Sequence, residues 1–236
     1  HLVWLTLETM NDAAHAIRVM QVRGAPLIGA TAAFGFAFGL TEDASDEGLE
    51  KAWQTLFQTR PTAVNLRWAL DRVRALVQPM PVQYRAEAAW REALRISDDD
   101  ALTNQTLGQH GLRVFREVLA GKAAGDTLHV MTHCNAGWLA TVDWGTATAP
   151  IYQAQAQGLA LHVWVDETRP RNQGASLTAW ELGQAGVPHT LVADNAGGHL
   201  MQHGEVDIVI VGCDRVTARG DVCNKIGTYL KALAAR

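Results

Sequence analysis

The sequence has little cysteine, and its cysteines do not have the paired spacing of a disulfide framework. Only Cys134, Cys213 and Cys223 occur in 236 residues, which favours reduced thiols. The sequence also lacks a cleavable leader pattern. Its longest apolar stretch, residues 25–40, is interrupted by glycines and is shorter than a bilayer requires. These absences predict a cytoplasmic protein that does not span a membrane.

Positive charge is also not in excess. The chain has 20 Lys and Arg against 24 Asp and Glu, with a net charge of -4. No basic stripe is present, so we expect no nucleic-acid partner. Neither a P-loop nor a Gly-x-Gly-x-x-Gly pattern occurs, so we expect no nucleotide cofactor.

A metal site is not expected either. On a strand, His129 and His133 share one face while Cys134 points to the other, so the three do not converge. His199 and His203 have helical spacing, but the glutamate of the zinc-protease motif is absent.

The residues that are present change their pattern once along the chain. Hydrophobic residues make up 48%, enough for a sizeable core. Residues 1–122 mostly repeat at helical spacing, which predicts a mainly helical N-terminal domain. Residues 1–9 alternate instead and predict a strand. Residues 123–236 contain short apolar runs separated by helical patterns, which predict a Rossmann-like α/β domain with a parallel sheet.

Four apolar runs in the second region end in polar clusters. The runs, with the polar residues that end them, are residues 127–133, 159–168, 189–194 and 206–215, and helices are expected over residues 145–158 and 175–186. The clusters are His133-Cys134-Asn135, Asp166-Glu167-Thr168-Arg169, Asp194-Asn195 and Asp214-Arg215. Ligands bind at the carboxyl ends of parallel strands, so these clusters predict a shared cleft.

Several of these residues have a second interpretation. Asp194 and Asn195 are also typical helix caps. Cys134 is either a small buried hydrophobic residue or a thiolate stabilised by the start of a following helix. Arg23 and Arg60 are placed to clamp a phosphate before predicted helices, although single arginines are usually solvated surface residues.

Longer motifs point to a known family. Over residues 3–233, "VRGAPLIG", "RPTAVNLRWA", "THCNAGWLAT", "VDETRPRNQGASLTAWEL" and "GCDRVTARGDVCNKIGTY" resemble the methylthioribose-1-phosphate isomerases of methionine salvage. These enzymes form a wider group with ribose-1,5-bisphosphate isomerase and the regulatory subunits of translation initiation factor 2B. The resemblance implies an aldose-ketose isomerase that acts on 5-methylthioribose 1-phosphate as a homodimer.

The resemblance also implies which residues form the site. The catalytic cysteine and aspartate of the family correspond to Cys134 and Asp214. The substrate contacts of the family correspond to Arg23, Gly24, Ala25, Arg60, Gln173, Asn224 and Lys225.

Some positions depart from the family pattern. Cys213 and Cys223 replace the usual alanines, and Trp138 replaces a small residue. Family members are longer at both ends, so we expect this sequence to be truncated at both ends.

The chemistry explains the implied roles. An aldose 1-phosphate is locked as a cyclic acetal, and its ring oxygen must be protonated before it opens. We expect the apolar run before Asp214 to raise the pKa of its carboxyl group, which would make it a general acid. Cys134 then takes the C2 proton or stabilises a hydride shift, and both routes remain open. Arg23, Arg60 and Lys225 would hold the phosphate.

Other activities remain open at this point. Ribose 1,5-bisphosphate and 5-deoxyribose 1-phosphate are alternative substrates for an isomerase. A non-catalytic ligand sensor similar to the initiation-factor subunits is an alternative of another class.

Overall fold

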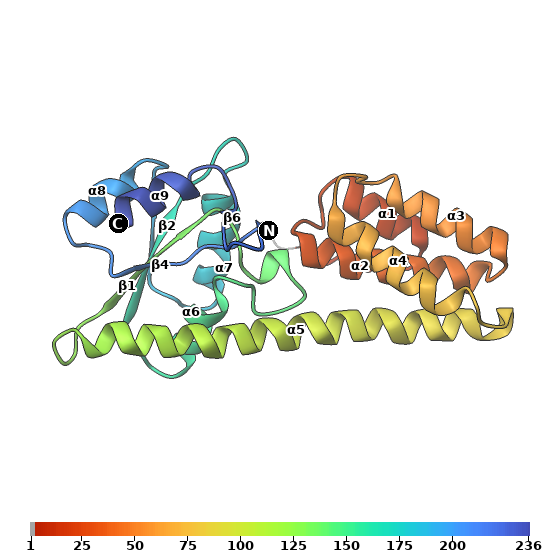
Figure 1. The fold of residues 1–236 in the computed structure, drawn as a ribbon, viewed down its shortest axis with the longest axis horizontal. Helices are drawn as coiled ribbons and strands as arrows, with labels where there is room; N and C mark the ends of the chain where they lie inside the picture. The colour runs from red at the N-terminus through yellow and green to blue at the C-terminus, as the bar shows by residue number, and fades with distance from the viewer. Residues whose placement is uncertain (1–2) are drawn as a thin grey trace. The chain divides into compact units, whose positions relative to one another are not determined.

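The computed structural model describes residues 3–236, which form two compact units (Figure 1). The first unit comprises the chain up to Leu102 together with Ala140–Val142. The second comprises Thr103–Leu139 and Asp143–Arg236. The long helix α5 (Val82–Ala120) contributes to both units. The predicted fold class is confirmed, since a mainly helical region precedes a parallel sheet.

Helices make up the first unit. They are α1 (Met10–Arg18), α2 (Ala25–Glu42), α3 (Asp46–Phe57), α4 (Val64–Val77) and the first part of α5. Side chains of Thr9 and Ser45 cap α1 and α3, which satisfies backbone N–H groups that lack partners within the helix. Phe36 of α2 is fully buried within the apolar core of the unit.

Helix α2 is the most apolar helix of the unit. It has 18 residues, and its length and composition are those of a possible membrane span. The helix is therefore longer than the apolar stretch of residues 25–40 identified from the sequence. However, 61% of it is buried inside the structure, and core helices pass the same test. A Cβ atom at Gly35 would lie 2.9 Å from both the Ala13 and Leu56 side chains. Such close packing favours a core helix.

The strand predicted for residues 1–9 is not formed in its described part. Residues 3–7 have no regular secondary structure, and residues 1–2 lie outside the described residues. Val3 and Trp4 are exposed, and the backbone N–H groups of Glu8 and Thr9 donate to the Asp12 carboxylate. A strand needs a neighbour for its backbone groups, and alternation alone does not supply one.

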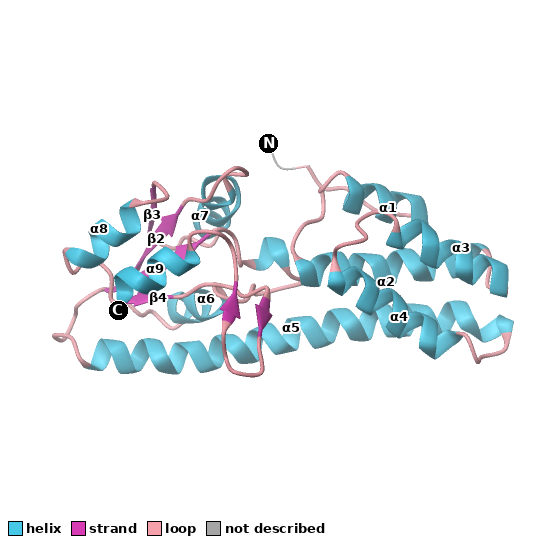
Figure 2. Ribbon diagram, turned by 45° about the horizontal axis from the view of Figure 1, so that its top comes forward, coloured by secondary structure: helices cyan, strands magenta, loops and turns pink. Residues whose placement is uncertain are grey.

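A four-stranded parallel sheet forms the centre of the second unit (Figure 2). Its strands are β1 (Leu128–His133), β2 (Leu161–Asp166), β3 (His189–Val192) and β4 (Ile208–Val209), in the order β3-β2-β1-β4. The remaining helices of the unit are α6 (Ala149–Ala156), α7 (Ala179–Gln184), α8 (Ala196–Gln202) and α9 (Thr228–Ala235). The predicted alternation of strands and helices is therefore present.

Alternation along β1 and β2 gives the sheet two different faces. One face carries Leu128, Val130, Val163 and Val165, which pack in an apolar core with residues of α5, α6 and α7. On the opposite face, residues of the two strands pair in register, so that His129 lies opposite His162 and His133 opposite Asp166. Paired residues of parallel strands point to the same side of a sheet. This register brings two ionisable side chains together at the strand ends.

Candidate functional site

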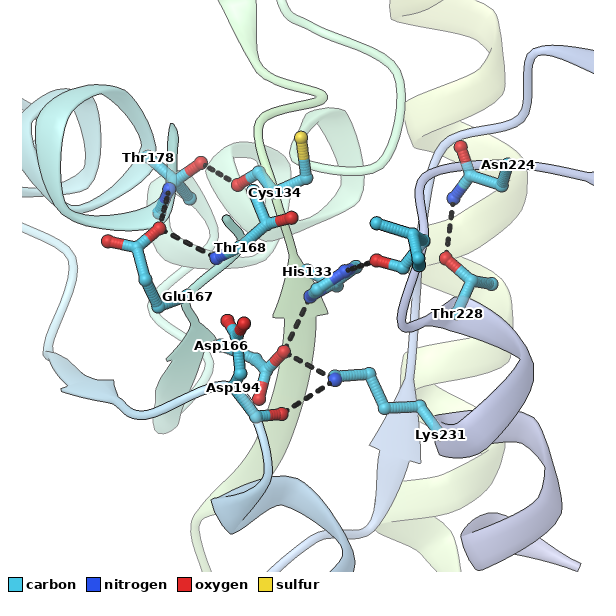
Figure 3. Close-up of polar contacts among 12 residues, drawn as sticks. His133, Cys134, Asp166, Glu167, Thr168, Thr178, Asp194, Asn224, Thr228 and Lys231 are labelled. Atoms are coloured by element: carbon cyan, nitrogen blue, oxygen red, sulfur yellow. Dashed lines mark hydrogen bonds and ion pairs between the residues drawn. The ribbon is translucent and has the colours of Figure 1, made fainter. Parts of the chain in front are cut away.

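Three of the four predicted polar clusters meet in a buried network at the strand ends (Figure 3). His133 Nδ1 lies 2.5 Å from Asp166 Oδ2, and Lys231 Nζ of α9 lies 2.6 Å from the same oxygen. Lys231 Nζ also donates to the backbone oxygen of Asp194 at 3.0 Å. His133 Nε2 lies 2.7 Å from the carbonyl oxygen of Ile226.

Cys134 and Gln173 are brought together beside this network. Cys134 directly follows β1 with a φ of 64° and is only 7% exposed. Its thiol donates to Gln173 Oε1 at 3.4 Å, and its backbone oxygen accepts a bond from Thr178 Oγ1 at 2.5 Å. In Figure 3 the sulfur points away from the pair formed by His133 and Asp166. The cysteine is therefore held by both its backbone and its side chain.

The helix expected directly after Cys134 is not there. An irregular loop follows, then the three-residue 3-10 helix η1 (Trp138–Ala140), and α6 begins at Ala149. The proposed stabilisation of a thiolate by a helix start is therefore wrong. The polar group next to the sulfur is instead the amide of Gln173.

The loop after Cys134 folds around a buried carboxyl group. Glu181 of α7 is fully buried. Its Oε1 accepts a bond from Asn135 Nδ2 at 3.3 Å, and its Oε2 accepts a bond from the backbone N–H of Leu139 at 3.2 Å. A Cβ atom at Gly137 would lie 1.3 Å from Glu181 Oε1. Only glycine leaves room for this carboxyl group.

We expect Gly137→Ala to destabilise the protein by roughly 3–5 kcal/mol, because overpacking adds to the loss of hydrogen bonds at a buried carboxyl group. Urea denaturation of the purified variant measures this change. Gly121→Ala is the matched control, since its nearest new contact is the Val118 carbonyl oxygen at 3.4 Å. Equal stability of the two variants would show that the loop adapts and that Gly137 is not required.

Glu167 fixes the loop that carries Gln173. Its carboxylate accepts three backbone N–H bonds, from Thr168 at 2.7 Å, Gly174 at 2.8 Å and Ala175 at 2.9 Å. Gln173 is the N-cap residue of the π-helix η2 (Gly174–Thr178), so this carboxylate holds the backbone next to it. Sequence reasoning placed Glu167 in a polar cluster without a role. No sequence signal pointed to this role, because Glu167 lies seven residues before the start of η2.

Asp214 lies apart from the strand ends. Strand β4 ends at Val209, well before the end of the predicted run of residues 206–215. Asp214 is exposed and immediately precedes an antiparallel hairpin of β5 (Arg215–Val216) and β6 (Val222–Cys223). Its backbone N–H donates to the Cys223 carbonyl at 2.8 Å. The expectation of an apolar environment for Asp214 is therefore wrong, because its run continues from a short edge strand rather than from the sheet interior.

Asn224 and Lys225 lie in the turn between β6 and α9. Asn224 Nδ2 donates to Thr228 Oγ1 at 3.0 Å (Figure 3), and the Lys225 carbonyl accepts from Thr228 N at 3.1 Å. Ile226, the next residue, carries the carbonyl bound by His133. The turn is thus connected to the residue directly before Cys134.

The remaining candidates belong to the first unit. Gly24, with a φ of 88°, is the N-cap of α2, and a Cβ atom there would lie 2.2 Å from the Ala140 carbonyl oxygen. Ala25 is the first residue of that helix, and Arg23 directly precedes Gly24. Arg60 lies between α3 and α4, and its carbonyl accepts from Ala63 N at 2.9 Å. Both arginines therefore precede helices, as expected.

The capping interpretation of Asn195 is confirmed for its position in the chain but not for its side chain. Asn195 is the N-cap residue of α8, but its side chain makes no capping hydrogen bond. Within the described chain, Asp194 Oδ1 is buried without a hydrogen-bond partner. Asp194 lies beside the charged network shown in Figure 3, where its backbone oxygen accepts from Lys231 Nζ.

Histidines on the sheet do not form a metal cluster. Burial lowers the pKa of His162, and the neighbouring His129 and His189 lower it further. Its Nε2 lies 3.0 Å from Thr190 Oγ1. Across residues 3–236, no group of three or more His, Cys, Asp or Glu residues has the arrangement of a metal site.

Comparisons with known proteins give many relatives. The chain is 62% identical over 98% of its length to a methylthioribose-1-phosphate isomerase of Rhizobium meliloti (strain 1021), and it spans 64% of that relative. The structure of a 5-methylthioribose 1-phosphate isomerase from Pyrococcus horikoshii OT3 matches 97% of the chain, with 42% identity and a TM-score of 0.88. The chain spans 64% of that structure.

A structure of a differently named protein is nearly as similar. It is described as translation initiation factor eIF-2B, subunit delta, from A. fulgidus, and it matches 100% of this chain with 40% identity and a TM-score of 0.87. This chain spans 68% of it. The family model described as the initiation factor 2 subunit family matches residues 21–236. Because this match covers most of the sequence, the chain belongs to the initiation factor 2 subunit family.

Proposed function

We propose that the chain is an aldose-ketose isomerase that converts 5-methylthioribose 1-phosphate to 5-methylthioribulose 1-phosphate in methionine salvage. The main support is that the chain is 62% identical, over 98% of its length, to a relative named for that activity. The buried thiol of Cys134 beside Gln173 supports the same conclusion. Since the chain spans 64% of that relative, activity of the whole protein is part of this proposal.

Ring opening requires a proton for the ring oxygen, and Asp214 is the proposed donor. A carboxyl group donates more effectively at neutral pH when it is removed from water. Asp214 is exposed in this structure. We infer that the bound sugar phosphate covers the Asp214 carboxyl group and removes it from water, which the chain alone does not do.

Hydrogen transfer from C2 to C1 is assigned to the surroundings of Cys134. In one route a Cys134 thiolate removes the C2 proton, an enolate forms, and a proton is returned to C1. In the other route, hydride moves directly from C2 to C1. Gln173 serves either route, because its amide carries both an acceptor and a donor and can turn its donor towards a thiolate. Turnover in deuterated water separates them, since only the proton route incorporates deuterium at C1.

The proposed phosphate contacts are Arg23, Arg60 and Lys225, together with the N–H group of Gly24. Gly24, Ala25, Gln173 and Asn224 complete the proposed substrate contacts. Guanidinium groups suit phosphate because their forked donors match two oxygens.

We expect Arg60→Ala to weaken substrate binding by about 1.5–3 kcal/mol, a roughly 10- to 150-fold rise in KM with little change in kcat. Steady-state kinetics measures both parameters. Arg67→Ala is the matched control, because Arg67 is exposed and pairs with Asp71 within α4. An unchanged KM for Arg60→Ala would leave Arg60 as an ordinary surface arginine.

Several broader properties belong to the same proposal. The partner is a small sugar phosphate, no nucleic acid or membrane is involved, and the enzyme needs no cofactor or metal. It works in the cytoplasm as a homodimer. Residues 1–122 act as a helical domain and residues 123–236 as the Rossmann-like catalytic domain.

One observation favours a second candidate function, a ligand sensor without turnover. The chain is 40% identical to the structure described as an initiation factor subunit. A substrate panel of 5-methylthioribose 1-phosphate, ribose 1,5-bisphosphate and 5-deoxyribose 1-phosphate tests both candidates. Ketose formed fastest from the methylthio sugar supports the proposed function. Faster conversion of another sugar would change the substrate, and tight binding without ketose would favour the sensor.

A further inference from the structure

His133 has hydrogen-bond acceptors on both sides of its ring. Nδ1 lies 2.5 Å from the Asp166 carboxylate, and Nε2 lies 2.7 Å from the Ile226 carbonyl oxygen. A carbonyl oxygen can only accept. Asp166 Oδ2 also accepts from Lys231 Nζ at 2.6 Å. A neutral imidazole has only one N–H donor, so it cannot satisfy both contacts.

From this geometry we propose that His133 is held as an imidazolium and acts as a positioning residue for the turn that carries Asn224 and Lys225. The ring is 2% exposed, and the titratable groups around it are Asp166 of β2, Lys231 of α9 and Asp194 before α8. The proposal rests on the proposed function only where it concerns substrate binding by that turn.

The turn is shaped to receive the ring. Gly227 has a φ of 103°, and a Cβ atom there would lie 2.7 Å from His133 Nε2. Glycine therefore allows the backbone to approach the imidazole. Cys134 directly follows His133 in sequence. One side chain thus links the end of β1 to the proposed substrate contacts.

Loss of one ring proton from His133 would break its hydrogen bond to the turn. Asp166 is the stronger acceptor, so a neutral His133 keeps its remaining proton on Nδ1. The lone pair of Nε2 then faces the Ile226 carbonyl, and the bond to the turn is lost. We expect KM for the sugar phosphate to be higher with a neutral His133 than with the imidazolium, while kcat changes little.

Nitrogen-15 NMR of the histidine rings in the full chain tests the protonation directly. Assignment through backbone-linked resonances requires no substitution. We expect both ring nitrogens of His133 to be protonated at neutral pH, and the exposed ring of His203 serves as the comparison. A His133 ring with one unprotonated nitrogen at neutral pH would overturn the proposal.

Amide hydrogen exchange tests the positioning role without substrate. In His133→Gln, we expect exchange over residues 224–228 to be roughly tenfold faster than in the unaltered chain, since one hydrogen bond to the turn is lost. His203→Gln is the control. If His133→Gln does not fold, Gly227→Ala tests the same contact by pushing the turn away from the ring. Unchanged exchange in the folded variant would overturn the positioning role.

Kinetics then separates this inference from the proposed function. We expect His133→Gln to raise KM roughly tenfold with little change in kcat. An equal loss in kcat, with KM unchanged, would overturn the positioning role. If the unaltered chain forms no ketose phosphate, the proposed function fails, while ring protonation and amide exchange still decide the inference.

Discussion

We expect Cys134→Ser to lower kcat by about 10²- to 10⁴-fold, the usual contribution of a general acid or base. A hydroxyl is a much weaker acid than a thiol, so serine cannot form the anion that the proton route requires. The substitution is small, and the serine hydroxyl can still donate to Gln173 Oε1, so the fold should be retained. Steady-state turnover of 5-methylthioribose 1-phosphate measures the loss.

Cys223→Ser is the matched control for this prediction. Cys223 is an exposed free cysteine, whereas Cys134 is a buried one. The control should keep nearly normal turnover. If Cys134→Ser also does so, neither proton transfer nor stabilisation of a hydride shift depends on the thiol, and the assignment of Cys134 is wrong.

We expect Asp214→Asn to lower kcat by about 10²- to 10⁴-fold, because an amide cannot deliver a proton to the ring oxygen. Asp214 is exposed and its backbone is tied to Cys223, so the variant should fold normally. Substrate binding should change little, since the defect lies in ring opening. Single-turnover experiments with the enzyme in saturating excess over substrate separate these effects.

Asp221→Asn makes the same charge change in the same hairpin. The Asp221 carboxylate accepts a bond from Thr217 Oγ1 at 3.1 Å and has no proposed catalytic role. It should retain turnover. Equal losses in the two variants would mean that the charge of the hairpin matters, rather than a proton from Asp214.

Much of the fold followed from the sequence. The spacing of the apolar residues predicted the helices of the first unit and the parallel strands. A helix or a strand with one buried face carries apolar residues at a fixed interval along the chain. The pattern failed at residues 3–7, where alternation has no strand partner. It also overestimated β4, which has one neighbour in the sheet and pairs over only two residues.

The candidate site was less predictable. The strand-end rule found His133, Cys134 and Asp166, because parallel strands in register bring their ends together. Lys231 and Glu181 were missed, since a buried charge on a helix shows no sequence pattern until its partners are known. Gln173 was identified only through the family resemblance, because its contact with Cys134 depends on how the intervening loop folds.

The most direct test of the proposed isomerase activity is turnover of 5-methylthioribose 1-phosphate by this chain. Formation of the ketose phosphate is followed by NMR. The Rhizobium meliloti relative serves as the positive control for the assay. We expect the chain to form 5-methylthioribulose 1-phosphate, and both Cys134→Ser and Asp214→Asn to abolish most of this conversion. A folded chain that binds the sugar phosphate but forms no ketose, while the relative does, would contradict the proposed isomerase activity.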